Sequence, residues 1–183
     1  MSNKTGFFNL EENINSTIYE GLLKLGYQNN ESFSIYYDLD LLNHLLQTAF
    51  ESNELCLGYL QEFKAYAKKH LFDIEISLER NRFKFTVSKD GIEYIYKHEN
   101  NPFLQELIQT VNTHSFHLED ILAIFKRYSG DYVCEEIDND EFQYVLYFKN
   151  NRFDRFKYCF TFDEMGGYYH RLLDFSYNKI MNE

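Results

Sequence analysis

The segment from Cys159 to Arg171 brings together residue types that commonly carry out catalysis. It contains a thiol at Cys159, a carboxylate at Asp163 and an imidazole at His170, with the glycine pair Gly166-Gly167 between them. A cysteine acts as a nucleophile when a histidine within hydrogen-bonding reach helps to form its thiolate. This segment therefore supports one hypothesis for the chain: a small enzyme with Cys159, Asp163 and His170 as its catalytic residues.

The pairing of two expected strands, residues 156–162 and 168–172, decides whether these side chains can meet. In one register, Phe160 lies opposite His170 and Cys159 faces the other side of the sheet. In the next register, Thr161 lies opposite His170 and Cys159 shares its face. The aromatic residues at alternate positions from 156 to 162 predict that their face is the core. This pattern favours ordinary strand packing and a surface hairpin over a catalytic dyad.

The spacing His114-x-x-His117 is the sequence's nearest approach to a metal-binding motif. A zinc ion needs three or four converging nitrogen, sulfur or oxygen ligands. Ser115 is expected to begin a helix, so the two imidazoles do not obviously share one face. Nucleotide loops and hydrolase elbows also lack their motifs in this chain. We therefore expect no metal and no cofactor, and keep His114 and His117 as the weak metal candidates.

The charge of the chain limits the kinds of partner that it attracts. Eighteen Lys and Arg residues against 29 Asp and Glu residues give a formal net charge of −11. Such a charge repels nucleic acid at long range and favours a basic protein or peptide. Basic and aromatic residues at positions 149–157 could clamp single-stranded nucleic acid, but the net charge opposes this alternative. Acidic residues are concentrated in an expected turn: Asp131, Glu135, Glu136, Asp138, Asp140 and Glu141.

Aromatic residues are the feature of the composition that most needs an explanation. The chain has 18 Phe and 16 Tyr residues and no Trp. A core cannot easily satisfy so many tyrosine hydroxyls, so several should line a cleft or an exposed sheet face that recognises a ligand. Tyr168, Tyr169 and Arg171 are the candidates for such contacts. The alternative is that an AT-rich genome has shifted the composition toward Phe and Tyr.

The hydrophobic pattern predicts an α+β fold with antiparallel sheets and helices segregated to one face. Helical periodicity covers residues 10–25, two segments between 39 and 67, and two more after Pro102 and Ser115. Alternating patterns predict a strand at 32–37 and a three-stranded meander over residues 72–96, whose last turn is Asp90-Gly91. Four further strands are expected between residues 131 and 172, followed by a short helix from Asp174.

The order of these elements suggests one domain, residues 1–183. Its expected sub-structure is a mainly helical part at 1–70, a β-meander with two helices at 71–130, and a second β-meander at 131–183. The segments 63–96 and 122–162 share one plan, an amphipathic helix followed by antiparallel strands. This shared plan suggests a degenerate internal duplication.

The cysteine pattern and the lengths of the hydrophobic segments predict where the protein is located. Three cysteines without a C-x-x-C pair argue against a disulfide framework and fit a reducing cytoplasm. No signal peptide is visible, and no apolar stretch reaches the roughly 20 residues that a membrane-spanning helix needs. We expect a cytoplasmic protein that is not embedded in a membrane.

Part of the N-terminal quarter resembles a known family. The residues Lys24-Leu25-Gly26-Tyr27, then Ile35-Tyr36-Tyr37-Asp38-Leu39, then Leu42-Asn43-His44-Leu45-Leu46 resemble the opening of a small bacterial family catalogued only as a domain of unknown function. The resemblance implies a bacterial cytosolic protein. It supplies no activity, cofactor or catalytic residue.

The sequence therefore favours a non-enzymatic cytoplasmic binding protein over an enzyme, without deciding between them. A Tyr/Phe-lined face would form the contact, and acidic turns would steer a basic partner. The alternative is the small enzyme with a site around Cys159, Asp163 and His170.

Overall fold

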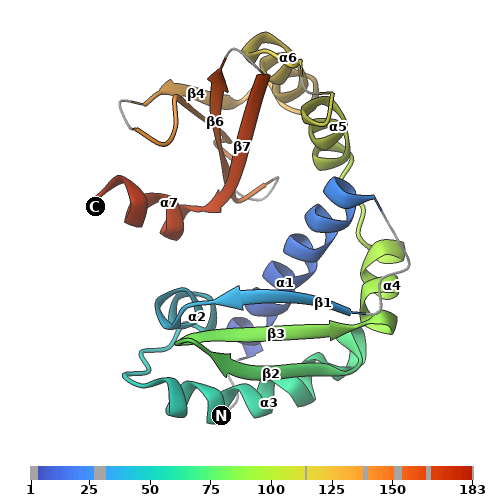
Figure 1. Ribbon diagram of the computed structural model, residues 1–183, viewed down its shortest axis with the longest axis vertical. Helices are drawn as coiled ribbons and strands as arrows, with labels where there is room; N and C mark the ends of the chain where they lie inside the picture. Colours follow the sequence, from blue (N-terminus) through green and yellow to red (C-terminus); the bar gives the residue numbers. More distant parts are fainter. Residues whose placement is uncertain are drawn as a thin grey trace. The chain divides into compact units, whose positions relative to one another are not determined.

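The computed structural model describes residues 4–26, 32–113, 115–137, 140–150, 154–163 and 166–182. It confirms the α+β class, with helices and two antiparallel sheets (Figure 1). The chain divides into two compact units, Met1–Asn100 (unit 1) and Asn101–Glu183 (unit 2). None of the described helices combines the length and the apolar character needed to cross a membrane.

Unit 1 contains four helices and three strands among its described residues. In chain order these are α1 (Lys4–Leu25), β1 (Ser32–Tyr37), α2 (Leu39–Leu46), α3 (Asn53–Leu71), β2 (Ile74–Glu79), β3 (Arg82–Ser88) and α4 (Lys89–His98). Local signals in the sequence begin several of them. The Asp38 side chain accepts a hydrogen bond from the backbone N–H of Leu41 and so caps α2. Ser52 caps α3 in the same way through the N–H of Leu55.

The sheet of unit 1 has the strand order β1-β3-β2, and both pairings are antiparallel. The predicted alternation holds in the central strand, where Phe83, Phe85 and Val87 are fully buried. Helices α1, α3 and α4 contact the sheet strands, and the side chains between the buried ones form an open polar face. The helices of this unit therefore lie on one face of its sheet.

The predicted third strand of the meander is wrong, because residues 89–98 form helix α4. Strand β1 comes from far away in the sequence and occupies the edge of β3 that a local third strand would have used. Ile92 and Ile95, one helical turn apart, are buried instead. The Asp90-Gly91 pair, expected to be a hairpin turn, lies in the first turn of this helix.

The same pairing of β1 with β3 explains the boundary between the units. It joins residues 32–37 to residues 82–88 in one sheet. The helical N-terminal part and the first hairpin therefore share a core, and the division falls at Asn100 instead of near residues 70 and 130.

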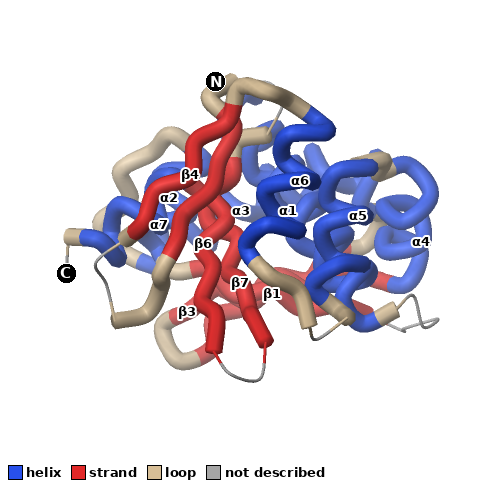
Figure 2. The backbone as a smooth tube through the Cα atoms, turned by 90° about the horizontal axis from the view of Figure 1, so that it is seen from above, coloured by secondary structure: helices blue, strands red, loops and turns tan. Residues whose placement is uncertain are grey.

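Unit 2 contains three helices and four strands among its described residues. These are α5 (Pro102–Val111), α6 (Leu118–Tyr128), β4 (Tyr132–Glu136), β5 (Tyr144–Phe148), β6 (Phe156–Asp163), β7 (Gly166–Leu173) and α7 (Asp174–Met181). The four strands form the predicted antiparallel meander in the order β4-β5-β6-β7. Figure 2 shows β6 and β7 running side by side.

Helices pack on both faces of the sheet of unit 2. On one face, the ring of Phe103 from α5 and that of Phe125 from α6 lie 5.0 Å and 4.8 Å from the ring of Phe148. On the other face, Tyr177 and Ile180 of α7 pack against a cluster that contains Cys159. The two units share an amphipathic helix followed by a hairpin but differ in strand order, so the topology adds no further support for a duplication.

Candidate functional site

Cys159 and His170 lie directly opposite each other on β6 and β7. This register is one residue away from the first alternative considered above and two residues away from the second, so neither predicted pairing is correct, although Cys159 and His170 do share a face as in the second. Both side chains belong to the sheet face that α7 partly covers. The structure therefore brings these two of the three candidate catalytic residues together as a cross-strand pair.

The environment of Cys159 does not favour a thiolate. The side chain is fully buried, and this burial raises the pKa of the thiol to about 12, although the Lys157 ammonium acts in the opposite direction. The thiolate is the nucleophilic form, so the thiol is protonated and weakly nucleophilic at neutral pH. His170 is exposed, with its ring 5.5 Å from that of Phe142. Asp163 is exposed at the end of β6, opposite Gly166.

The three candidates for ligand contacts on β7 point to different surroundings. Tyr168 is 48% exposed. Tyr169 is buried, with its ring 5.8 Å from that of Phe160. Arg171 lies on the same face of β7 as Tyr169 and contacts the ring of Phe156 at 3.5 Å. The three side chains therefore do not line one common surface.

Arg171 is part of a buried polar network that no pattern in the sequence predicts. Its Nε atom donates to the hydroxyl of Tyr158, and that hydroxyl donates to Oδ2 of Asp154 at 2.9 Å. Oδ1 of Asp154 accepts from the backbone N–H of Phe156. Burial raises the pKa of Asp154, and the Arg171 guanidinium opposes this effect. Because its described polar atoms are paired, the network fits a role in holding β6 and β7 together.

Of the two metal candidates, His114 and His117, the structure describes only the second. His114 lies outside the described residues. His117, not Ser115, is the N-cap of α6, and its backbone N–H donates to the Asp120 carboxylate at 2.8 Å. Within the described ranges, no group of three or more His, Cys, Asp or Glu side chains is arranged to hold a metal ion.

The basic and acidic segments of unit 2 partly neutralise each other. Lys149 pairs with Asp131 at 3.2 Å, and Lys157 pairs with Asp174 at 3.4 Å. Glu135 accepts from the hydroxyl of Tyr147. Arg152 in the basic segment and Asp138 in the acidic turn lie outside the described residues, while Glu136, Asp140 and Glu141 are exposed.

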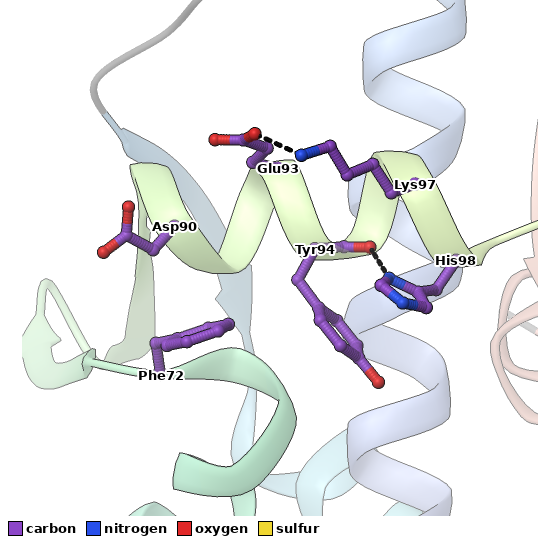
Figure 3. A pocket seen from close by; sticks show the side chains of 6 residues that line it. All are labelled: Phe72, Asp90, Glu93, Tyr94, Lys97 and His98. Atoms are coloured by element: carbon purple, nitrogen blue, oxygen red, sulfur yellow. Dashed lines mark hydrogen bonds and ion pairs between the residues drawn. The ribbon is translucent and has the colours of Figure 1, made fainter.

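A pocket on unit 1 combines aromatic rings with ionisable groups and is the candidate site. It has a volume of about 280 Å³ and is lined by Phe72 at the end of α3 and by five residues of α4: Asp90, Glu93, Tyr94, Lys97 and His98. We call it the α4 pocket. Figure 3 shows the ring of Phe72 below the first turn of α4, with Tyr94 and His98 reaching from the same side of that helix.

Phe72 is held in a backbone conformation that glycine favours. It follows the last residue of α3 with φ 56° and ψ −119°. This combination is the one that glycine adopts at the first central position of a type II′ turn, and it is strained for a bulky side chain. Its ring is 41% exposed and lies 6.1 Å from the ring of Tyr94. The strained backbone of Phe72 therefore positions an aromatic ring in the lining of the pocket.

The charged groups of the α4 pocket differ in their pairing. Glu93 and Lys97 form an ion pair at 2.5 Å, and this pair lowers the pKa of Glu93. The Nδ1 atom of His98 donates to the backbone oxygen of Tyr94 at 2.8 Å, and the rings of the two residues stack at 4.0 Å. Within the described part of the chain, the Asp90 carboxylate has no ion pair and is available to a ligand.

The buried carboxylate of Glu11 contacts Tyr94 of the α4 pocket indirectly, through His70. The ring of His70 stacks on Tyr94 at 5.9 Å, and its Nδ1 atom lies 3.0 Å from Oε1 of Glu11. Burial raises the pKa of Glu11, whereas the interaction with His70 lowers it. Tyr94 therefore stacks with two imidazoles, those of His70 and His98, and the first of these is hydrogen-bonded to Glu11.

Sequence reasoning missed the α4 pocket because it treated residues 92–96 as a strand. A signal was present, since Asp90, Tyr94 and Lys97 share one face of a helix but not of a strand. The position of Phe72 against that face has no counterpart in the sequence pattern.

Comparison with known proteins extends the resemblance noted at the N-terminus. No curated protein and no solved structure matches the chain. The family described as "Domain of unknown function, E. rectale Gene description (DUF3877)" matches residues 7–181, well beyond the N-terminal quarter. The chain therefore belongs to this family, whose description names no activity.

Proposed function

We propose that the chain is a non-enzymatic, cytoplasmic bacterial protein that binds a basic protein or peptide through the α4 pocket. In this proposal a lysine or arginine side chain of the partner lies against the exposed ring of Phe72, beside Tyr94. Asp90 supplies the carboxylate that pairs with the cation.

The chemistry of the lining supports a cationic ligand. A cation over an aromatic face is attracted by the ring quadrupole, and the attraction grows as water is excluded. Phe72 provides an exposed ring of this kind, Tyr94 lies edge-to-face beside it, and Asp90 adds a formal negative charge to the same pocket. The net charge of −11 attracts basic partners over a longer range.

The observation that carries the proposal is the backbone conformation of Phe72. A strained conformation costs about 1–3 kcal/mol and persists where the surrounding structure imposes it, often at a binding site. A glycine at this position would relieve the strain. Phenylalanine instead places an exposed ring next to Tyr94, which is consistent with a use for the ring outside the core.

A titration with a defined cationic probe tests the proposal. The probe is a short peptide with alternating lysine and glycine residues, and its matched control is the same peptide with every lysine acetylated. We expect the backbone amide resonances of Asp90 and Tyr94 to shift saturably with the charged peptide only. Equal shifts with the acetylated peptide, or none with either, would contradict the proposal.

Two variants remove the charge and one ring separately. Asp90→Asn and Tyr94→Leu should each weaken binding of the charged peptide by roughly three- to thirtyfold. Glu62→Gln, which removes one exposed carboxylate from α3, is the matched control and should weaken it far less. Equal losses in Asp90→Asn and Glu62→Gln would show that only the overall charge matters.

Phe72→Gly separates binding from folding. This variant removes the ring and allows the backbone conformation, so we expect weaker peptide binding without a lower thermal unfolding midpoint. Unchanged binding by this variant would overturn the role given to the aromatic pair.

A further inference from the structure

A second cluster of ionisable and aromatic side chains lies on unit 1, on the open face of its sheet. It consists of Tyr36 on β1, Glu79 on β2, Arg80 in the following turn, and Arg82 and Lys84 on β3. We call it the Tyr36 cluster. Four of these residues, Tyr36, Glu79, Arg80 and Arg82, line a pocket of about 440 Å³. This volume is within the range of small-molecule sites in proteins.

Strand register brings the cluster together. Tyr36 lies opposite Lys84, and Glu79 lies opposite Arg82 across the β2–β3 hairpin. The Arg82 guanidinium carbon and the Lys84 ammonium lie 5.7 Å and 6.0 Å from the centre of the Tyr36 ring. Tyr36 itself is 39% exposed, so its ring is accessible from solvent.

Hydrogen bonds hold the members of the cluster in place. Lys84 donates to Oε1 of Glu79 at 3.0 Å, and the Tyr36 hydroxyl donates to Oε2 of the same carboxylate at 3.3 Å. Arg82 donates to the backbone oxygen of Tyr36 at 3.3 Å. Three cations and one carboxylate leave a local charge of +2 on a chain whose net charge is −11.

Arg80 lies in a turn that its side chain does not stabilise. Arg80 and Asn81 form a two-residue hairpin loop with φ values of 50° and 64°. Such a loop favours Asn followed by Gly, and a long side chain at its first position is strained. Among the described residues, the Arg80 guanidinium has no ion pair, and it lines the pocket next to Arg82. The residue is thus unfavourable for the turn but suited to an anion.

We propose that the Tyr36 cluster binds a nucleoside phosphate. Guanidinium groups recognise phosphate oxygens through paired, charge-assisted hydrogen bonds, and Arg80 and Arg82 offer two of them. The Tyr36 ring gives the base a surface for stacking. The Glu79 carboxylate accepts hydrogen bonds from the sugar hydroxyls or from an amino group of the base. This site is separate from the α4 pocket and does not depend on the function proposed for it.

Calorimetric titration of the full chain with ADP, adenosine and inorganic phosphate tests the proposal. We expect saturable binding of ADP, with adenosine and phosphate each weaker by about tenfold or more, because each makes only part of the contacts. Binding of phosphate alone as tightly as ADP would overturn the proposal. So would the absence of saturation with ADP.

Arg80→Asn is the decisive variant, because asparagine suits the turn better than arginine does. We expect its affinity for ADP to fall by about tenfold while its thermal unfolding midpoint stays the same or rises. Lys69→Ala removes one exposed cation from α3 and should leave ADP binding nearly unchanged. If both variants bind ADP as the wild type does, the assignment of the phosphate to Arg80 is wrong.

Two further measurements test the stacking role of Tyr36 and the class of phosphate ligand. Tyr36→Leu should weaken binding of ADP but not of inorganic phosphate, because only the stacking surface is lost. A short single-stranded oligonucleotide serves as the other phosphate-bearing probe. If it binds in a manner that Arg80→Asn abolishes while ADP does not bind, the cluster is a nucleic-acid surface and the proposal of a nucleotide site is overturned.

Discussion

Gly91 lies so close to the carbonyl oxygen of Leu71 that a Cβ atom at this position would be 2.6 Å from it. The same Cβ atom would lie 2.6 Å from Cγ1 of Val87. The first turn of α4 therefore rests directly on the end of α3. This close approach places Phe72, the residue after Leu71, next to Asp90 in the α4 pocket.

Gly91→Ala should separate these two helices. Alanine favours a helix over glycine by about 1 kcal/mol, but overpacking against a backbone oxygen costs about 1–3 kcal/mol or more. We expect a net decrease in the free energy of unfolding, measured by urea denaturation. Gly58→Ala on α3 is the control, because nothing lies within 4 Å of its added Cβ atom. That variant should gain about 0.5–1 kcal/mol, and an equal gain in Gly91→Ala would contradict the packing.

Glu11 should make stability decrease with rising pH. Its pKa in the folded chain lies above the ordinary value of 4.5, chiefly because burial disfavours the charged carboxylate. The folded chain therefore binds this proton more readily than the unfolded chain does. The resulting contribution to stability is fully present below pH 4.5 and is lost as pH rises through the folded pKa.

Glu11→Gln removes this titration, so its stability relative to the wild type should improve as pH rises through the folded pKa of Glu11. Urea denaturation at a series of pH values measures the difference. Glu62→Gln, at an exposed position on α3, should show no such trend. A relative stability of Glu11→Gln that falls with pH would show that the ion pair with His70 outweighs burial.

Tyr158→Phe should destabilise unit 2. The fully buried hydroxyl of Tyr158 joins Asp154 to Arg171, and its removal leaves both with one hydrogen bond fewer. Loss of a buried partner costs about 1–3 kcal/mol. Tyr128→Phe removes a single hydrogen bond, to the backbone oxygen of Pro102, and should cost less. Chemical denaturation followed by circular dichroism distinguishes the two, and equal costs would show that the network is not cooperative.

The three cysteines should differ in their reactivity toward iodoacetamide at neutral pH. Burial raises the pKa of Cys56 to about 11 and that of Cys159 to about 12, whereas Cys134 is exposed. We expect mass spectrometry of the native protein to find label first on Cys134, and the denatured protein to be labelled on all three. Rapid labelling of native Cys159 would restore the hypothesis of a catalytic thiolate.

Local signals in the sequence were sufficient for much of the secondary structure. The alternation of Phe83, Phe85 and Val87 predicted β3 and its buried face. Asn101-Pro102 marked the start of α5, where the Asn101 side chain accepts from the N–H of Leu104. These signals act within a few residues, so one sequence contains all that is needed to detect them.

Local signals of this kind could not predict which distant strands pair. Nothing near residues 89–98 indicates that β1 fills the edge of β3, and the segment is a helix in that context. The register that sets Cys159 opposite His170 is likewise decided by packing on both faces of the sheet, and a slip of one residue reverses every side chain.

The chain by itself determined the α+β class, the net charge of −11 and the ends of several helices, because these depend on residue type and on neighbours in sequence. Tertiary structure alone decided the two pockets. Phe72 faces Tyr94, and Arg80 faces Arg82 and Tyr36, only after elements distant in sequence have packed. The physical reason is that such contacts follow from the burial of apolar faces over the whole unit, which no local pattern records.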